Sequence, residues 1–182
     1  MSSIPELRTA RLKLAAFGER HLTAEYVRWL NDRDLMRYSE QRHKVHTIET
    51  CRQYMQSFEG TSNCFWAIEE VGAGLGHIGN INSYVDSRHR VADIGIVIGD
   101  ARAAKHGFGL EAWTAVCDFL FDVVGIRKIT AGTMALNTAM IRLALSAGMT
   151  EDGVRKRHYL YEEQEVDVVH FALFATDRRL QD

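Results

Sequence analysis

Hydrophobic and polar positions alternate with a period of two in several short stretches of the chain. In Val91–Ile98 the residues Ile94, Ile96 and Ile98 alternate with Asp93, Gly95 and Val97. Such alternation, with β-branched residues dominating, predicts a β-strand. By the same criteria we expect further strands at residues 11–17, 64–69, 77–84, 128–133, 153–161 and 166–175.

Apolar residues spaced three and four apart predict helices between these strands. The clearest stripe follows Gly109 and ends at Gly125; its members are Leu110, Trp113, Cys117, Leu120 and Val124. Other helices are expected at residues 21–30, 34–38 (one short turn), 48–58 after Thr47 as N-cap, and 137–148 with Asn137 as N-cap. The order β-α-α-β-β-β-α-β-α-β-β predicts an α/β (α+β) protein with a mixed sheet.

Composition restricts the class of protein. The chain has 182 residues, of which 46% are hydrophobic and 25% charged, as in a soluble single domain. A net charge of −2 argues against a nucleic-acid partner. We find no apolar run of membrane-spanning length, no signal-peptide pattern and no C-x-x-C motif among the three cysteines. We therefore expect buried thiols, no membrane association and a cytoplasmic location.

A basic, glycine-rich loop joins the strand at 91–98 to the long helix. It carries Arg102, Lys105 and His106 and ends in Gly107-Phe108-Gly109. Free N–H groups at a helix N-terminus, together with cationic side chains, favour a phosphate or pyrophosphate. The alternative is a plain strand-to-helix turn with two glycines. A Walker motif is absent, and Lys128 and Ile129 stand where a dinucleotide fold would carry an acid.

The sequence segments on either side of this loop resemble those of a known family. The run ADIGIVIGD, the loop and HGFGLEA resemble motif A of the GNAT superfamily of N-acetyltransferases, in the RimJ/RimL-like branch that includes nucleotide-sugar amine acetyltransferases. Gly107 and Gly109 match the pattern [QR]-x-x-G-x-[GA], with Ala104 at its first position. ITAGTMALNTAMIRLALSAGMTEDG is similar to a second family block. The resemblance spans nearly the whole chain and implies one GNAT domain over 1–182, with helices on both faces of the sheet.

The resemblance also implies that acetyl-CoA is the co-substrate. In the family, the main chain of the central strand pairs with pantetheine, the loop meets the pyrophosphate and an asparagine reaches the pantetheine arm. The cofactor-binding residues implied here are Ile96, Val97, Ile98, Arg102, Lys105, His106, Gly107, Phe108, Gly109, Leu110, Asn137 and Met140. Ala144 stands where many members carry a tyrosine that protonates the leaving thiolate, so that proton must come from another group.

Three residues are candidates for proton transfer. Asp93 lies on the central strand where family members commonly carry an acid, and it can act as a base through a water molecule. The alternative is an ordinary solvent-facing or salt-bridged side chain. His158 and Tyr159, in the last hairpin, are rival acid/base groups or plain surface residues. Glu111 opens the cofactor helix, where an acid complements the helix dipole and is structural.

The acceptor site is less well defined. Trp29, Met36 and Tyr38 either line it, as that region does in relatives, or cap the sheet. Arg155–His158 either protects an exposed strand edge or meets an acceptor's phosphate. The eight histidines show no metal-binding spacing, so we expect no metal.

The sequence therefore predicts an acetyl-CoA-dependent N-acetyltransferase that acts on a primary amine by direct attack in a ternary complex. The acceptor is a protein N-terminus, an amino sugar or a small-molecule amine, and the enzyme is a monomer or homodimer. The alternative class is a coenzyme-A-binding sensor or scaffold without turnover. A dinucleotide-dependent oxidoreductase is a distant third.

Overall fold

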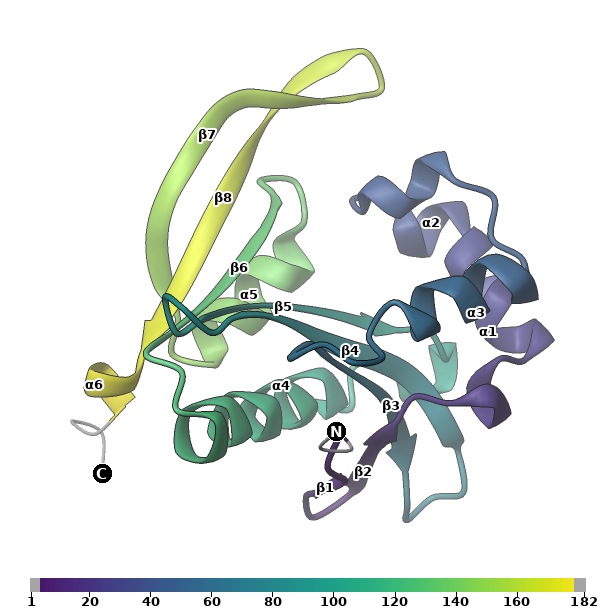
Figure 1. Cartoon of the computed structure of the whole chain (residues 1–182). Coiled ribbons are helices and arrows are strands. Elements are labelled where there is room, and N and C mark those ends of the chain that lie inside the picture. The colour runs from purple at the N-terminus through teal and green to yellow at the C-terminus, as the bar shows by residue number, and fades with distance from the viewer. Residues whose placement is uncertain (1–3, 179–182) are drawn as a thin grey trace.

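The computed structural model describes residues 4–178, and its strands form one eight-stranded sheet (Figure 1). The strand order is β1-β2-β3-β4-β5-β6-β8-β7. Within the described residues, every neighbouring pair is antiparallel except β5 and β6. The strands are β1 Leu7–Arg8, β2 Leu12–Ala16, β3 Cys64–Glu70, β4 Gly76–Asp86, β5 Val91–Ile98, β6 Lys128–Met134, β7 Thr150–Tyr161 and β8 Gln164–Phe174.

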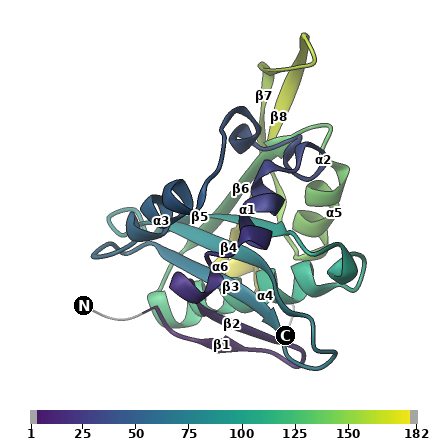
Figure 2. The ribbon, with the colours of Figure 1, turned by 90° about the vertical axis from the view of Figure 1, so that its right-hand side faces the viewer.

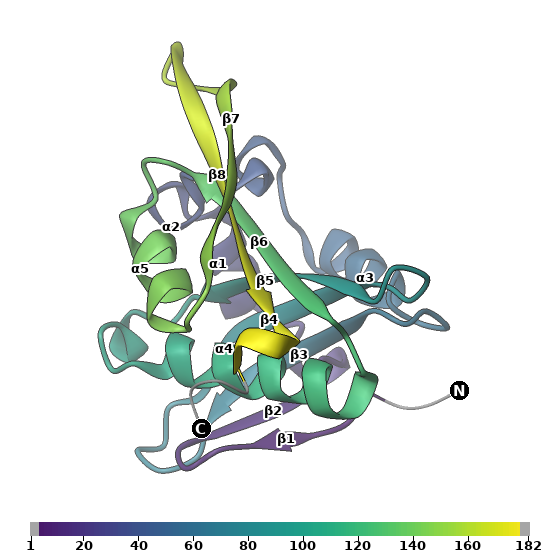
Figure 3. The ribbon, with the colours of Figure 1, turned by 90° about the vertical axis from the view of Figure 1, so that its left-hand side faces the viewer.

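Helices cover both faces of this sheet, as the resemblance implies. The helices α1 (Ala24–Asn31), α2 (Arg33–Met36) and α3 (Ile48–Gln56) lie over one face, seen in front of the sheet in Figure 2. On the other face α4 (Phe108–Phe119) crosses the sheet, with α5 (Thr138–Ser146) beside it (Figure 3). Short turns complete the structure: η1 Glu19–His21, η2 Glu40–His43, η3 Ala101–Ala103, the π-turn η4 Leu120–Val124 and α6 Ala175–Arg178.

Each face of the sheet has its own hydrophobic core, and β3 contributes to both. Trp66 and Ile68 point into the core beneath α4, whereas Phe65 and Ala67 point into the core beneath α1 and α3. A central strand buried on both faces has no polar side to present, which explains its nearly continuous apolar sequence. The three cysteines are buried, as predicted.

The predicted strands and helices are all present, with boundaries shifted by a few residues. The sequence pattern missed β1, which has only two residues, and α6, which has four. It also began the strand β7 at Gly153 instead of Thr150. The register shifts between Glu151 and Gly153, and this bulge interrupts the alternation from which the start was predicted. Residues 1–3 and 179–182 of the expected domain lie outside the described part.

The parallel strands β5 and β6 separate shortly after they begin. They pair only at Val91–Lys128, Ala92–Ile129 and Asp93–Thr130. Beyond this point β5 continues along β4, while β6 turns away with β8 (Figure 1). The main chain of Ile94–Ile98 therefore has no strand partner on its β6 side within residues 4–178. Unpaired main-chain groups in the middle of a sheet are available to a ligand.

A histidine is partly buried among the aromatic residues beneath α1. The imidazole of His77 lies 5.2 Å from the Trp29 ring and 5.1 Å from the His21 ring, centroid to centroid. Its Nε2 lies 2.9 Å from the Gly79 carbonyl oxygen, so neutral His77 donates a hydrogen bond there. Burial, with the positive charge that His21 can carry, lowers the pKa of His77 to about 4.

This burial predicts a pH-dependent stability. Between pH 6.5 and pH 4 the unfolded chain binds a proton at His77 and the folded protein does not, so the free energy of unfolding falls as pH falls. The full effect is about 3 kcal/mol. The free energy of unfolding, measured with urea at several pH values in this range, should change less with pH in His77→Gln than in the wild type. The glutamine side chain can still donate to the Gly79 carbonyl oxygen. The exposed His89→Gln serves as control, and a slope unchanged in His77→Gln would contradict the interpretation.

Candidate functional site

The open side of β5 forms one wall of the candidate cofactor site. Ile96, Val97 and Ile98 are each partly exposed although they lie in a central strand. On their other side β4 lies very close to β5: a Cβ at Gly79 would be only 2.2 Å from the Val97 carbonyl oxygen. Glycine is therefore required at 79, and the register of β5 against β4 is fixed where β5 faces the opening.

The loop after β5 has a rigid first half. Asp100 is buried and its carboxylate caps η3 by accepting the Arg102 N–H at 2.8 Å. The Arg102 guanidinium lies 2.6 Å from the same carboxylate and holds the pKa of Asp100 below its ordinary value. Arg102 was predicted to bind the pyrophosphate. In the structure its guanidinium already forms an ion pair with Asp100. Lys105 is exposed and, within residues 4–178, makes no ion pair.

The second half of the loop presents a helix N-terminus. Gly107 is the N-cap of α4, with a φ of 79°, and no side chain caps the helix. The first N–H groups of α4, beginning with Phe108, Gly109 and Leu110, thus have no intrahelical acceptor. A Cβ at Gly109 would lie 3.2 Å from Leu143 Cδ1 of α5 and 3.7 Å from Ile98 Cγ1. This glycine allows α4, α5 and β5 to meet closely at the helix start.

An arginine far away in the sequence holds the loop in place. Arg11 Nη1 donates to the His106 carbonyl oxygen at 3.0 Å, and its guanidinium lies 4.7 Å from the Phe108 ring centroid. Its Nη2 lies 2.6 Å from Glu111, which also accepts a hydrogen bond from Thr9 at 2.6 Å. Glu111 is thus a structural anchor, as predicted. The sequence analysis missed Arg11, because nothing in its local pattern points to a loop 95 residues further on.

The start of α5 forms the opposite wall. Asn137 caps this helix: its Oδ1 accepts the Met140 N–H at 3.2 Å, and its Nδ2 donates to Thr133 Oγ1 at 3.0 Å. The predicted N-cap is confirmed. Both polar atoms of its amide are therefore engaged within the protein. Met140 packs against the core beneath α4, and Ala144 is completely buried.

A cavity of about 300 Å³ opens at the point where β5 and β6 separate. It brings together three residues predicted from different parts of the sequence: Asp93, Tyr38 and Tyr159. Asp93 is in the last pair of the β5–β6 ladder, opposite Thr130, whose hydroxyl donates to Asp93 Oδ2 at 2.8 Å. The remaining lining residues are Ser39, Glu40, Gly132, Thr133, Met134, Val168 and His170.

Asp93 has an unusual electrostatic environment. The residue is exposed where it lines the cavity, but the protein around the carboxyl removes part of its water and raises its pKa above the ordinary value, while the hydrogen bond from Thr130 and the charge of His170 act in the opposite direction. A raised pKa brings a carboxylate closer to the range in which it can accept a proton at neutral pH. Glu40, the other acidic residue of the cavity, is paired with Arg42 at 2.7 Å.

The outer wall of this cavity is closed by the β7–β8 hairpin, which projects beyond the body of the sheet (Figures 1 and 2). Near its tip, the Tyr161 ring lies 5.5 Å from the Tyr38 ring. Arg42 Nη2 donates to the Leu160 carbonyl oxygen at 3.2 Å. The hairpin and the α2–η2 segment, more than 100 residues apart, thus meet across the cavity.

Other predicted residues lie elsewhere. Trp29 is 4% exposed and packs on Gly99, where a Cβ would come within 2.1 Å of the indole. Met36 is 3% exposed. Trp29 belongs to the core beneath α1 and α3, which is the second of the two interpretations weighed for it. His158 is exposed outside the cavity, beside the Tyr159 ring at 4.9 Å.

The basic run 155–158 lies on the edge strand β7, and all four of its residues are exposed. Lys156 pairs with Asp167 at 2.9 Å and Arg157 lies 3.7 Å from Glu165. These acidic partners on β8 fit the edge-protecting interpretation, in which charged side chains discourage pairing with another strand.

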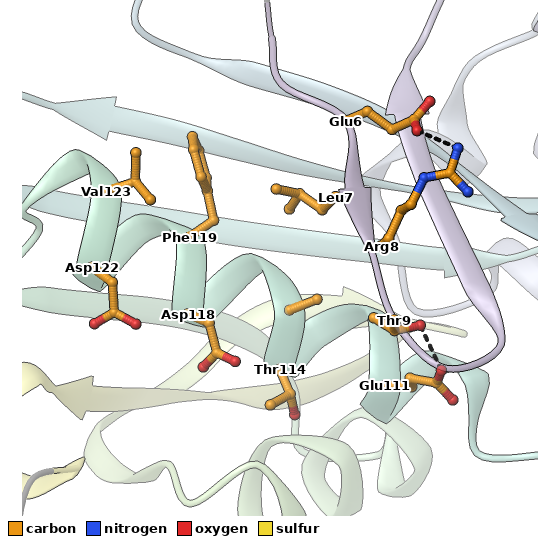
Figure 4. Close-up of a pocket in the computed structure, with 11 residues that line it drawn as sticks. Glu6, Leu7, Arg8, Thr9, Glu111, Thr114, Asp118, Phe119, Asp122 and Val123 are labelled. Atoms are coloured by element: carbon orange, nitrogen blue, oxygen red, sulfur yellow. Dashed lines mark hydrogen bonds and ion pairs between the residues drawn. The ribbon is translucent and has the colours of Figure 1, made fainter.

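A larger groove, of about 630 Å³, lies between β1 and α4 (Figure 4). None of the residues predicted for catalysis, cofactor or acceptor lines it. Its walls are Glu6, Leu7, Arg8, Thr9, Glu111, Thr114, Ala115, Asp118, Phe119, Asp122 and Val123. Four of its eleven lining residues are acidic, and none of the eleven belongs to β5 or β6.

The described residues contain no group of three or more His, Cys, Asp or Glu side chains placed to hold a metal ion. None of the helices in the described part combines the length and apolar character needed to cross a membrane.

Solved structures with the same arrangement define the class of fold. A GNAT-family acetyltransferase from Bacillus anthracis superimposes with a TM-score of 0.80 at 20% identity, covering 94% of this chain and 99% of that one. A spermidine N-acetyltransferase from Vibrio cholerae, in complex with CoA and spermine, gives 0.80 at 18% identity and 92% and 98% coverage. RimL, a ribosomal L7/L12 alpha-N-protein acetyltransferase in complex with coenzyme A, gives 0.81 at 17% identity and 93% and 98% coverage. The fold is that of the GNAT acetyltransferases.

The sequence itself places the chain in the family. Residues 11–150 match the model of the acetyltransferase (GNAT) domain, so the protein belongs to the GNAT acetyltransferase family. A search of curated proteins gives no significant match. The family resemblance and the mixed fold predicted from the sequence are thereby confirmed.

The contacts of Arg11 predict its effect on the loop. Arg11→Gln removes the guanidinium that neutralises Glu111 and binds the His106 carbonyl, so we expect a loss of about 1–2 kcal/mol in unfolding free energy. Amide hydrogens of residues 104–110 should also exchange faster with deuterium. Arg8→Gln, which breaks only the exposed pair with Glu6, should change neither. Equal exchange in the two variants would exclude the anchoring role.

Proposed function

We propose that this protein is an acetyl-CoA-dependent N-acetyltransferase in which a primary amine attacks the thioester directly in a ternary complex. The observation that carries the proposal is the position of Asp93. The carboxylate stands at the last pair of the β5–β6 ladder, where the acceptor cavity meets the unpaired main chain of β5. A base at that point can reach an amine that approaches an acetyl group held on β5.

The cofactor has a suitable binding surface on three sides. We propose that the main chain of Ile96–Ile98 pairs with the pantetheine arm and polarises the thioester carbonyl. The pyrophosphate meets the N–H groups at the start of α4 and the ammonium of Lys105. Arg102 adds positive potential but already neutralises Asp100, and Asn137 organises the start of α5 on the other side.

Lys105 provides a direct test of the cofactor site. Since its ammonium makes no ion pair within residues 4–178, Lys105→Gln should leave stability unchanged and weaken CoA binding about five- to tenfold. Isothermal titration with CoA should show that the difference shrinks as salt is raised, as expected for an exposed charge. Lys44→Gln, in the exposed η2–α3 connection, is the control. Equal CoA affinity in both variants would remove Lys105 from the site.

The acceptor cavity favours a small cationic amine, or the amine end of a larger molecule. Its volume of about 300 Å³ lies at the lower limit for small-molecule sites. The carboxylates of Asp93 and Glu40 and the rings of Tyr38 and Tyr159 attract an ammonium group. Protein N-termini, amino sugars and small-molecule amines all remain within this proposal. An alkylamine with a pKa of about 10.4 is almost fully protonated at pH 7, so the acceptor needs a base.

Thiol release from acetyl-CoA tests both the function and the base. The panel should contain UDP- and dTDP-amino sugars, peptides with free N-termini, and polyamines. Turnover on one class identifies the acceptor. On that substrate we expect Asp93→Asn, which keeps the hydrogen bond from Thr130, to lower kcat/KM by about 10²–10⁴-fold. The control Asp86→Asn lies at the end of β4 and retains an acceptor for the His89 N–H.

The same measurements separate the alternatives. Unchanged activity in Asp93→Asn would remove Asp93 as the base while leaving the acetyltransferase function intact. Tight binding of acetyl-CoA without turnover on any amine would favour the non-catalytic sensor or scaffold, a class that the absence of a tyrosine hydroxyl at Ala144 keeps open.

A further inference from the structure

Besides Asp93, the acceptor cavity contains a second side chain suited to proton transfer. His170 lies on β8, directly opposite Gly132 of β6 and on the same face of the sheet as Asp93. Its ring rests over the backbone of Gly132, where a Cβ would lie 3.1 Å from Nδ1 and 3.2 Å from Cε1 of the imidazole. The absence of a side chain at 132 thus makes room for the imidazole in the cavity.

The imidazole is not accounted for by protein contacts. Within residues 4–178 its Nε2 is shielded from solvent and has no hydrogen-bond partner. A buried polar group without a partner is less stable than one that is hydrogen-bonded. Buried polar groups are nearly always paired, and unpaired ones concentrate where function requires them. The other groups facing the cavity that can ionise are Asp93 from β5, Tyr38 and Glu40 near η2, and Tyr159 from β7.

We infer that His170 and Asp93 form one proton-accepting pair, in which the imidazole of His170 receives the proton that the acceptor ammonium must lose before it attacks. The inference deepens the proposed function and rests on it. An imidazole is matched to proton transfer near neutral pH. A carboxylate in the same cavity stabilises the imidazolium that forms, as an acid stabilises a catalytic histidine in other enzymes. Asp93 and His170 lie on the two strands that flank β6 and both line this cavity, so the carboxylate is placed to fill this role.

The proton balance of the reaction is complete with this pair. One N–H bond of the ammonium breaks and an N–H bond to the imidazole forms. The freed lone pair then makes the C–N bond to the acetyl carbon, and collapse of the tetrahedral intermediate breaks the C–S bond. The amide nitrogen gives up a second proton, and the CoA thiolate gains one. The proton on His170 passes to solvent. The missing tyrosine at Ala144 therefore creates no deficit of protons.

The experiment compares pH profiles of kcat/KM for the wild type, His170→Gln, Asp93→Asn and the double variant on the acceptor that the panel identifies. We expect each single variant to lose about 10²-fold at pH 7. The acidic limb of the profile should move to lower pH in both, because the imidazole that accepts the proton is absent in one variant and the carboxylate that stabilises its charged form is absent in the other. The double variant should lose little more than the worse single variant, since the two residues act as a unit.

Two further variants guard against a merely structural effect. Gly132→Ala keeps the imidazole but displaces it, so kcat/KM should fall while CoA affinity stays near wild type. His89→Gln, in the exposed β4–β5 turn, should behave as wild type. Losses that multiply in the double variant, or an acidic limb that stays in place in His170→Gln, would overturn the pairing. A wild-type protein that turns over no amine would contradict the proposed function itself, and this inference with it.

Discussion

The separation of β5 from β6 after three residue pairs is the constraint on which the site depends. A parallel pair in the middle of a sheet normally continues, because each main-chain group left unpaired is costly when buried. Here the gap is kept open by packing on either side. Gly79 brings β4 into close contact with β5, and β8 pairs with all seven residues of β6. Each strand is therefore held by its outer neighbour, and neither can close the gap without losing a ladder that is already formed.

The two faces of the sheet carry different residues at this gap, because each face packs against its own core. Side chains of β5 alternate between them, so Ile94, Ile96 and Ile98 face α4 while Asp93 faces the opposite side. A one-residue slip of β5 would place the carboxylate in the apolar core and the isoleucines in the acceptor cavity. The tight contact at Gly79 thus fixes both the shape of the cofactor wall and the side on which the acid appears.

Local patterns in the sequence predicted most of the fold, because strands, the α4 stripe and the caps Thr47 and Asn137 are determined by neighbouring residues. The loop with Gly107 and Gly109 was found for the same reason. What could not be predicted depends on contacts between distant segments. Arg11 reaches the loop from across 95 residues, and His170 enters the cavity only because β8 pairs with Gly132. Trp29 shows the reverse: its place in the sequence is compatible with a pocket, yet Gly99 makes room for it in the core.

The hairpin of β7 and β8 gives the acceptor cavity an independent wall. Its tip meets the α2–η2 segment through the Tyr38 and Tyr161 rings and one main-chain hydrogen bond from Arg42, whereas the cofactor loop is held by Arg11 at the other end of the molecule. Substitutions near the tip of the hairpin, beyond the residues of β8 that pair with β6, can therefore change the size and charge of the cavity without touching the residues that hold the gap open. The two walls of the gap are thus supported by separate segments of the chain, so the shape of one can change while the other stays as it is.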